Sequence, residues 1–150
     1  MFTQQTAIEH ARAGTLETWI HEYLQGEGRN SPFSDGLRLA PRQYWGPILF
    51  PLALLSRCTG PEPEMQYQVP VHDFEPRVVN IQKVIDAGAD LPPMIVNYSS
   101  GTLQLNDGNH RWEALVRSKV ESFGIVIWTT GEGDLAQFKE QYHREYEELV

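Results

Sequence analysis

The spacing of apolar residues predicts two helices near the start of the chain. Apolar side chains recur at intervals of three and four residues between positions 16 and 24, which predicts an amphipathic helix with one buried face. Before it, residues 6–9 match a capping box and Gly14 matches a helix end, so we expect a shorter helix there. The apolar segment 48–55 is interrupted by Pro51, and we expect it to be helical after that residue.

The second half of the chain predicts an alternation of helices and strands. Residues 78–87 carry an apolar stripe at helical spacing. Residues 94–98 and 102–105 flank a Ser-Ser-Gly turn, and together they predict a hairpin. Residues 123–128 predict a buried strand. Residues 134–149 begin with a capping box and carry leucine and aromatic residues on one stripe, which predicts a C-terminal helix.

These elements together predict an α+β fold, in which helices pack on a small mixed sheet. The turn Gly60–Glu64 is the best candidate for a boundary within the chain. It divides a helical N-terminal extension, residues 1–60, from a second domain, residues 61–150, that includes the C-terminal helix. A chain of 150 residues is long enough for one domain with such an extension packed on its core.

Charge and composition narrow the classes of partner. Lysine and arginine number 12 against 20 acidic residues, which gives a net charge of −8. Such a balance argues against DNA as a partner, because DNA binding depends on cations that neutralise phosphates. No secretion signal or membrane-spanning stretch is recognisable, and Cys58 is the single cysteine, so we expect a cytoplasmic protein without an internal disulfide. The sequence does not indicate an oligomeric state.

Residues 106–114 form the most informative segment of the chain. An alternating run that predicts a strand leads into Gly108, and a predicted helix follows. Glycine lets the backbone approach a ligand closely, and a helix start offers unpaired N–H groups and a positive dipole end. His110 and Arg111 add side-chain donors beside those groups. The segment therefore predicts an anion site, and the alternative is a tight turn whose Arg111 pairs with a nearby aspartate.

The segment Asp107-Gly108-Asn109-His110-Arg111 resembles the signature of the ParB/sulfiredoxin-like superfamily. That superfamily includes the N-terminal domain of ParB partition proteins, the sulfiredoxins, and serine kinases that use ADP or ATP. The similarity spans residues 67–128. Val69–Val71 resembles the first strand of the family, Phe74–Arg77 its Gln-Pro-Arg segment, and residues 91–96 its Pro-Ile-Val strand. The resemblance implies the ParB/sulfiredoxin-like fold, although one fold hosts several chemistries.

The resemblance also implies roles for individual residues. It implies a protein that binds a small anionic ligand or nucleotide, with ATP, ADP or CTP and Mg²⁺ as cofactors. The residues that would contact the ligand and its phosphates are Gly108, Asn109, His110, Arg111 and Arg77. Asp107 would hold the Mg²⁺, and Glu75 would act as general base in phosphoryl transfer to a small hydroxyl compound or in nucleotide hydrolysis.

Each of these roles has a structural alternative. Asp107 is equally well explained as a turn residue that accepts backbone hydrogen bonds, Glu75 as a solvated loop residue, and Arg77 as a surface arginine of a helix. Under these alternatives the protein is a non-catalytic module that binds a ligand or another protein. The choice between a small-molecule kinase, a nucleoside-triphosphate hydrolase and such a module is open at this point.

Two activities of the superfamily are disfavoured by the sequence. Asn109 stands where sulfiredoxins have their reactive cysteine, and Cys58 is expected to lie far from the motif, so sulfinic-acid repair would lack a nucleophile. A DNA-partition protein of ParB type is also disfavoured. Such a protein carries DNA-binding and dimerisation domains after this one, whereas we expect only an acidic helix before Val150.

Overall fold

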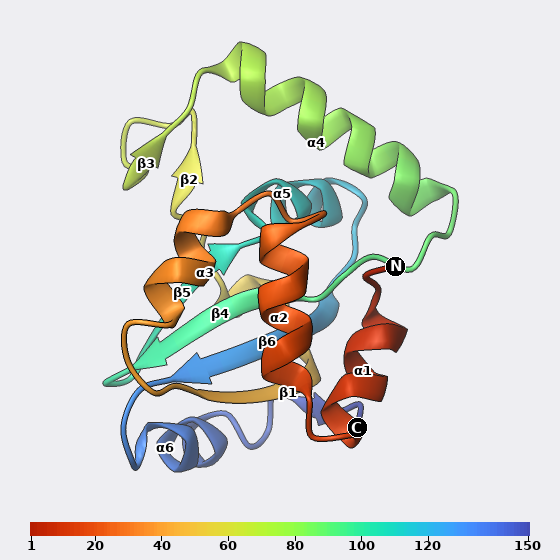
Figure 1. The fold of residues 1–150 in the computed structure, drawn as a ribbon. Helices are drawn as coiled ribbons and strands as arrows, with labels where there is room; N and C mark the ends of the chain where they lie inside the picture. The colour runs from red at the N-terminus through yellow and green to blue at the C-terminus, as the bar shows by residue number, and fades with distance from the viewer.

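A computed structural model describes residues 1–150 and has a mixed sheet of five strands at its centre (Figure 1). The strand order is β5-β4-β6-β1-β7, and only the β4–β6 pair is parallel. The strands are β1 (Gln43–Pro51), β4 (Met94–Ser99), β5 (Thr102–Asp107), β6 (Ser122–Thr129) and β7 (Glu147–Glu148). The predicted α+β class, the hairpin of β4 with β5 and the buried strand β6 are confirmed.

Both faces of the sheet are buried, because the side chains of β4 and β6 alternate between two hydrophobic clusters. Met94 and Ile125 lie in the larger cluster, whereas Ile95 and Val126 point into the other. Two helices cover the first face, α5 (Asn109–Arg117) and α6 (Asp134–Gln141). Three helices cover the second face, α1 (Gln4–Arg12), α2 (Leu16–Gln25) and α3 (Ser31–Leu37). The predicted helix with its apolar stripe at residues 16–24 is confirmed as α2.

The helix α4 (Val71–Asp86) forms an outer layer and does not cover the sheet directly (Figure 1). It packs on α5 through a small cluster that contains Phe74, Val78 and Ala114. A short parallel pair, β2 (Thr59–Gly60) and β3 (Tyr67–Gln68), precedes it. The helix α5 thus contacts both α4 and the segment at the start of β2. None of the helices combines the length and the apolar character needed to cross a bilayer.

The first sixty residues differ from the expected pattern in two places. Gln43–Pro51 forms β1, which pairs along its length with β6, and only a single 3-10 turn, Leu52–Leu54, follows Pro51. The first helix begins at Gln4 because Thr3 and Thr6 exchange capping hydrogen bonds, so the predicted N-cap at Thr6 lies three residues after the observed one at Thr3. The division into two domains at residue 60 stays a prediction. The strand β1, which precedes residue 60, belongs to the same sheet as the strands that follow it.

Two further elements have boundaries other than those expected. Val71, expected in a strand, opens α4, and the segment that resembles Gln-Pro-Arg therefore lies inside a helix. The C-terminal helix ends at Gln141 rather than continuing to the end of the chain. Tyr142 and Tyr146 then pack against Phe50 and Trp45 from a turn. Phe138 of the predicted apolar stripe is buried and the other members are partly buried, but helical geometry covers only the first part of the stripe.

Candidate anion-binding site

The site is built on the turn between β5 and α5, and Gly108 determines its shape. Gly108 has a φ of 110°, in the left-handed region that favours glycine. A Cβ at this position would lie 2.7 Å from Cγ of Met94 and 3.0 Å from Nη2 of Arg111. The close approach of backbone to side chains therefore requires glycine. The helix begins at the next residue without a side-chain cap, so no capping side chain bonds to its first N–H groups.

Arg111 is buried, and its guanidinium holds three segments together. Its Nη2 donates to Oδ2 of Asp107 at 2.9 Å, and its Nη1 donates to the carbonyls of Pro92 and Pro93 at 2.6 and 3.2 Å. The guanidinium also lies 5.7 Å from the ring centroid of Tyr23 in α2. This is the pairing that the sequence offered as the alternative to phosphate binding. Both terminal nitrogens of Arg111 already donate to protein acceptors. Direct contact between Arg111 and a ligand therefore stays a prediction.

Both carboxylate oxygens of Asp107 accept hydrogen bonds from side chains. One carboxylate oxygen accepts from Arg111 and the other from Nδ2 of Asn30 at 3.3 Å. Nowhere do three or more histidine, cysteine, aspartate or glutamate side chains gather closely enough to hold a metal. The arrangement does not fit Mg²⁺, because the cation would have to displace the Arg111 guanidinium. Burial, with Asp107 as a further cause, raises the pKa of Tyr23 to about 12.

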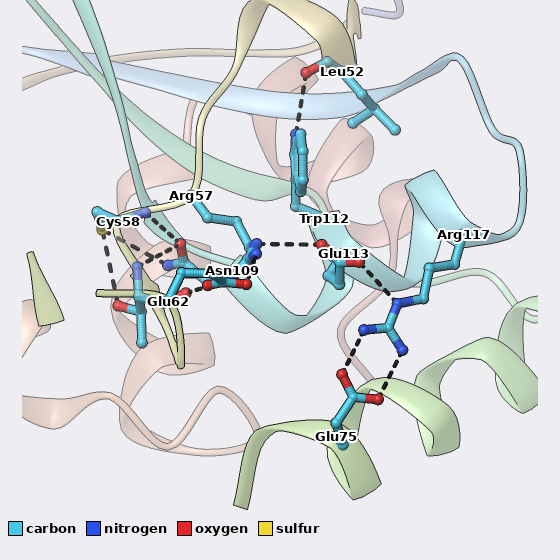
Figure 2. A network of polar contacts seen from close by, with 10 residues as sticks. Leu52, Arg57, Cys58, Glu62, Glu75, Asn109, Trp112, Glu113 and Arg117 are labelled. Atoms are coloured by element: carbon cyan, nitrogen blue, oxygen red, sulfur yellow. Dashed lines mark hydrogen bonds and ion pairs between the residues drawn. The ribbon is translucent and has the colours of Figure 1, made fainter. Parts of the chain in front are cut away.

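Asn109 joins the helix start to the segment that precedes β2. Its Oδ1 accepts hydrogen bonds from the backbone N–H groups of Cys58 and Thr59 at 2.9 and 3.2 Å (Figure 2). The Sγ of Cys58 lies 3.9 Å from Nδ2 of Asn109 and donates to the carbonyl of Leu105. The expectation that Cys58 lies far from the motif is therefore wrong. The segments are adjacent in space because residue 57 bridges to residue 105 at the edge of the sheet.

His110 is half-buried and lies within a group of arginines. Its ring packs on Phe74 of α4 with 4.9 Å between centroids. Burial, together with the charges of Arg77, Arg57 and Arg111, lowers the pKa of His110 to about 4. The imidazole is therefore neutral near pH 7 and offers one N–H donor. Arg77 is exposed and takes part in none of the ion pairs of the protein.

Glu75 lies at the other end of α5. Both of its oxygens accept from Arg117, the last residue of that helix, at 2.5 and 2.9 Å (Figure 2). Arg117 lowers the pKa of Glu75 through these hydrogen bonds. At 1.5 Å per residue, Arg117 stands about 9 Å further along the helix axis than Arg111. The structure therefore does not bring Glu75 and Asp107 together, although both were expected around one pocket.

A chain of alternating charges continues from this pair, and the sequence did not indicate it. Arg117 also pairs with Glu113 at 2.8 Å, Glu113 with Arg57 at 3.4 Å, and Arg57 with Glu62 at 2.5 Å (Figure 2). Glu113 thus connects two arginines, Arg57 and Arg117. The spacing of Glu113 and Arg117 is the one signal that could have revealed part of the chain. Arg57 gave no such signal, because its partners are set by the fold.

Comparisons with known proteins give little further information. No family model matches the chain, and no curated protein matches it. Among solved structures, it is similar to the C-terminally truncated chromosome-partitioning protein ParB from Caulobacter crescentus complexed with CTP-gamma-S. The identity is 20% and the TM-score 0.35, over 70% of this chain and 54% of that one. The chain thus spans about half of that structure, and a similarity this low carries no conclusion about ligand or activity.

Proposed function

We propose that the protein binds the phosphate groups of a nucleotide at the amino end of α5. The observation that supports this most directly is the environment of His110. Three arginines lower its pKa, and one of them, Arg77, is exposed without a carboxylate partner. Arg57 and Arg111 are paired with carboxylates, so Arg77 is the unpaired cation beside an uncapped helix start, in a chain whose net charge is −8.

Each residue that was predicted to contact the ligand has a role in this proposal. The backbone N–H groups near Gly108 and Asn109 would donate to phosphate oxygens, and His110 would add one neutral donor. Arg77 would contribute the charged fork. Arg111 would act as a positioning residue, because its contacts with Asp107 and Pro92 fix the turn that presents those N–H groups. ATP, ADP and CTP are the candidate ligands that the family resemblance suggests.

A non-catalytic binding module is the second candidate, and the state of the two acids favours it over a kinase or hydrolase. Glu75 would have to leave Arg117 before it could act as a base, and its lowered pKa makes it a weaker one. Asp107 would have to exchange its arginine for a metal ion. Binding without turnover requires neither change. A phosphate-release assay with wild type, Glu75→Gln and Asp107→Asn distinguishes the two, since an enzyme would lose activity in the variants.

Isothermal titration calorimetry tests the binding site itself. We expect wild type to bind CTP, ATP or ADP, and Arg77→Ala to weaken binding by about 10- to 100-fold, the effect of losing one charge-assisted hydrogen bond. Arg144→Ala is the matched control, because Arg144 is exposed in the turn after α6. Its affinity should equal that of wild type. Absence of binding for all three nucleotides and for inorganic tripolyphosphate at millimolar concentration would exclude the site.

A further inference from the structure

Several clefts on the surface have volumes of about 430–460 Å³, and one of them adjoins the motif directly. Its volume is about 460 Å³, and residues of α3, the β2–β3 pair and β5 contribute to its walls. The 8 residues that line it are Asn30, Pro32, Phe33, Cys58, Thr59, Tyr67, Gln104 and Asn106. It shares a wall with the anion site, because Asn30 donates to Asp107 and Asn109 accepts from the backbone of Cys58 and Thr59.

The lining of this cleft differs in charge from the adjoining motif. None of its residues is an aspartate, glutamate, lysine, arginine or histidine. A phosphate would have no cationic partner there, and burying its unpaired charge would be costly. An uncharged group has no such cost. The cleft therefore suits a neutral part of a ligand whose charged part lies at the amino end of α5.

Two side-chain amides in the lining have orientations fixed by their partners. The indole N–H of Trp128 donates to Oδ1 of Asn106 at 2.8 Å, and because an indole can only donate, the NH₂ group of Asn106 keeps both of its donors. The NH₂ group of Asn30 faces the carboxylate of Asp107, which leaves Oδ1 of Asn30 as an acceptor. The cleft residues thus include one oriented donor group, the NH₂ of Asn106, and one oriented acceptor, Oδ1 of Asn30.

Aromatic rings accompany these amides. Phe33 contributes its ring from α3, where it is held against Trp128 with 6.1 Å between centroids. Tyr67 contributes a ring from β3 and is 56% exposed, so one of its sides is open to a ligand. Aromatic side chains together with amide groups are a common means of holding nucleobases, through stacking and through hydrogen bonds to the base edge.

We propose that this cleft binds the nucleobase of the nucleotide whose phosphates occupy the amino end of α5. The inference rests on the proposed function and assigns the second half of the ligand. Asn106 donates to an acceptor on the base edge, Asn30 accepts from a donor on the same edge, and Tyr67 stacks on the ring. Asn106 stands two positions before Gly108, at most about 7 Å away along the chain, so the proposed base and phosphate positions adjoin each other.

The test compares nucleotides with inorganic tripolyphosphate, which has the charge but no base. We expect calorimetry on the full chain to give a nucleotide at least about fivefold tighter than tripolyphosphate, the lower limit for one stacked base. Tyr67→Leu and Asn106→Ala should remove this preference while the affinity for tripolyphosphate is unchanged. Asn80→Ala, on the exposed surface of α4, is the matched control and should keep the preference. Tyr67→Leu remains informative if Asn106→Ala is destabilised, because Tyr67 is largely exposed.

The outcomes separate this inference from the function on which it rests. Equal affinities for tripolyphosphate and every nucleotide, unchanged in Tyr67→Leu, would overturn the base site and leave the phosphate site standing. A wild-type protein that binds neither compound would overturn both proposals. A nucleoside that shifts the NMR signals of the Asn106 amide and the Tyr67 ring, without shifting those of His110, would support the cleft independently of the phosphate site.

Discussion

The two ends of α5 are held by arginine–carboxylate pairs that differ in exposure. At the amino end, the side chains of Arg111 and Asp107 are 8% and 10% exposed. At the carboxyl end, those of Arg117 and Glu75 are 33% and 40% exposed. The first pair joins β5, α5 and the entry of β4, whereas the second joins α5 to the outer helix α4. One helix thus has a fixed end that shapes the motif and an end whose charges are open to solvent.

This difference changes what each pair contributes. A buried charge that loses its partner is strongly destabilising, because the remaining charge has no water to solvate it. An exposed pair contributes little, because water and salt replace the partner. The two predicted catalytic acids fall one into each class. In the structure Asp107 bonds to Arg111 within the turn before α5, and Glu75 joins α4 to α5.

The largest effect is expected when the buried pair is broken. Arg111→Met leaves the Asp107 carboxylate and the Pro92 carbonyl without their donor, and we expect it to lower the free energy of unfolding by about 3–5 kcal/mol. Urea denaturation followed by circular dichroism measures this. Arg77→Met removes an exposed, unpaired arginine and should change the value by no more than about 0.5 kcal/mol. A loss below about 1 kcal/mol in Arg111→Met would contradict the structural role of the buried pair.

Local periodicity was sufficient to predict the parts of the fold that depend on neighbouring residues. The α2 stripe, the β4–β5 hairpin and the strand–turn–helix around Gly108 all have their determinants within a few positions. The strand β1 was missed for a physical reason. Gly46 and Pro47 interrupt its alternation, and its pairing with β6 shifts register between Trp45 and Ile48. Such a strand is specified by its partner rather than by its own sequence.

In the candidate site, too, the local features could be predicted from the sequence and the long-range contacts could not. The turn at the start of α5 was visible in the sequence because its residues are contiguous. The contact of Asn30 with Asp107 joins residues 77 positions apart, and that of Cys58 with Asn109 joins residues 51 positions apart. No pattern in the sequence connects such pairs. The assignment of Glu75 to the same pocket as Asp107 rested on the family resemblance, and α4 instead presents Glu75 to Arg117.

An intermediate effect is expected from pH, through His110. Its pKa is lowered from 6.5 to about 4, so the unfolded chain takes up a proton at higher pH than the folded protein. Stability should therefore fall as the pH falls from 6.5 to about 4, and the contribution of His110 should not change further below that range. His110→Gln should lose less stability than wild type over the same range, as measured by thermal unfolding.

The pKa of His110 also reports on a ligand bound beside it. An anion bound beside His110 favours the protonated imidazole, so tripolyphosphate should raise the NMR titration midpoint of His110 above about 4. His143 lies in the turn after α6 and serves as the internal control in the same spectra. A midpoint that does not move when the compound is shown to bind would place the anion elsewhere on the protein.

The smallest effect is expected when the exposed pair is broken. The pKa of Glu75 is lowered by Arg117, so its contribution to stability is present above the ordinary glutamate pKa and is lost as the pH falls through the lowered value. Glu75→Gln should reduce the melting temperature at pH 7 by much less than Arg111→Met does, and the reduction should disappear in acid. Its nucleotide affinity should equal that of wild type, because Glu75 bonds to the last residue of α5 and the phosphates are expected at the first. A Glu75→Gln protein with clearly altered nucleotide binding would mean that the two ends of α5 act on one ligand.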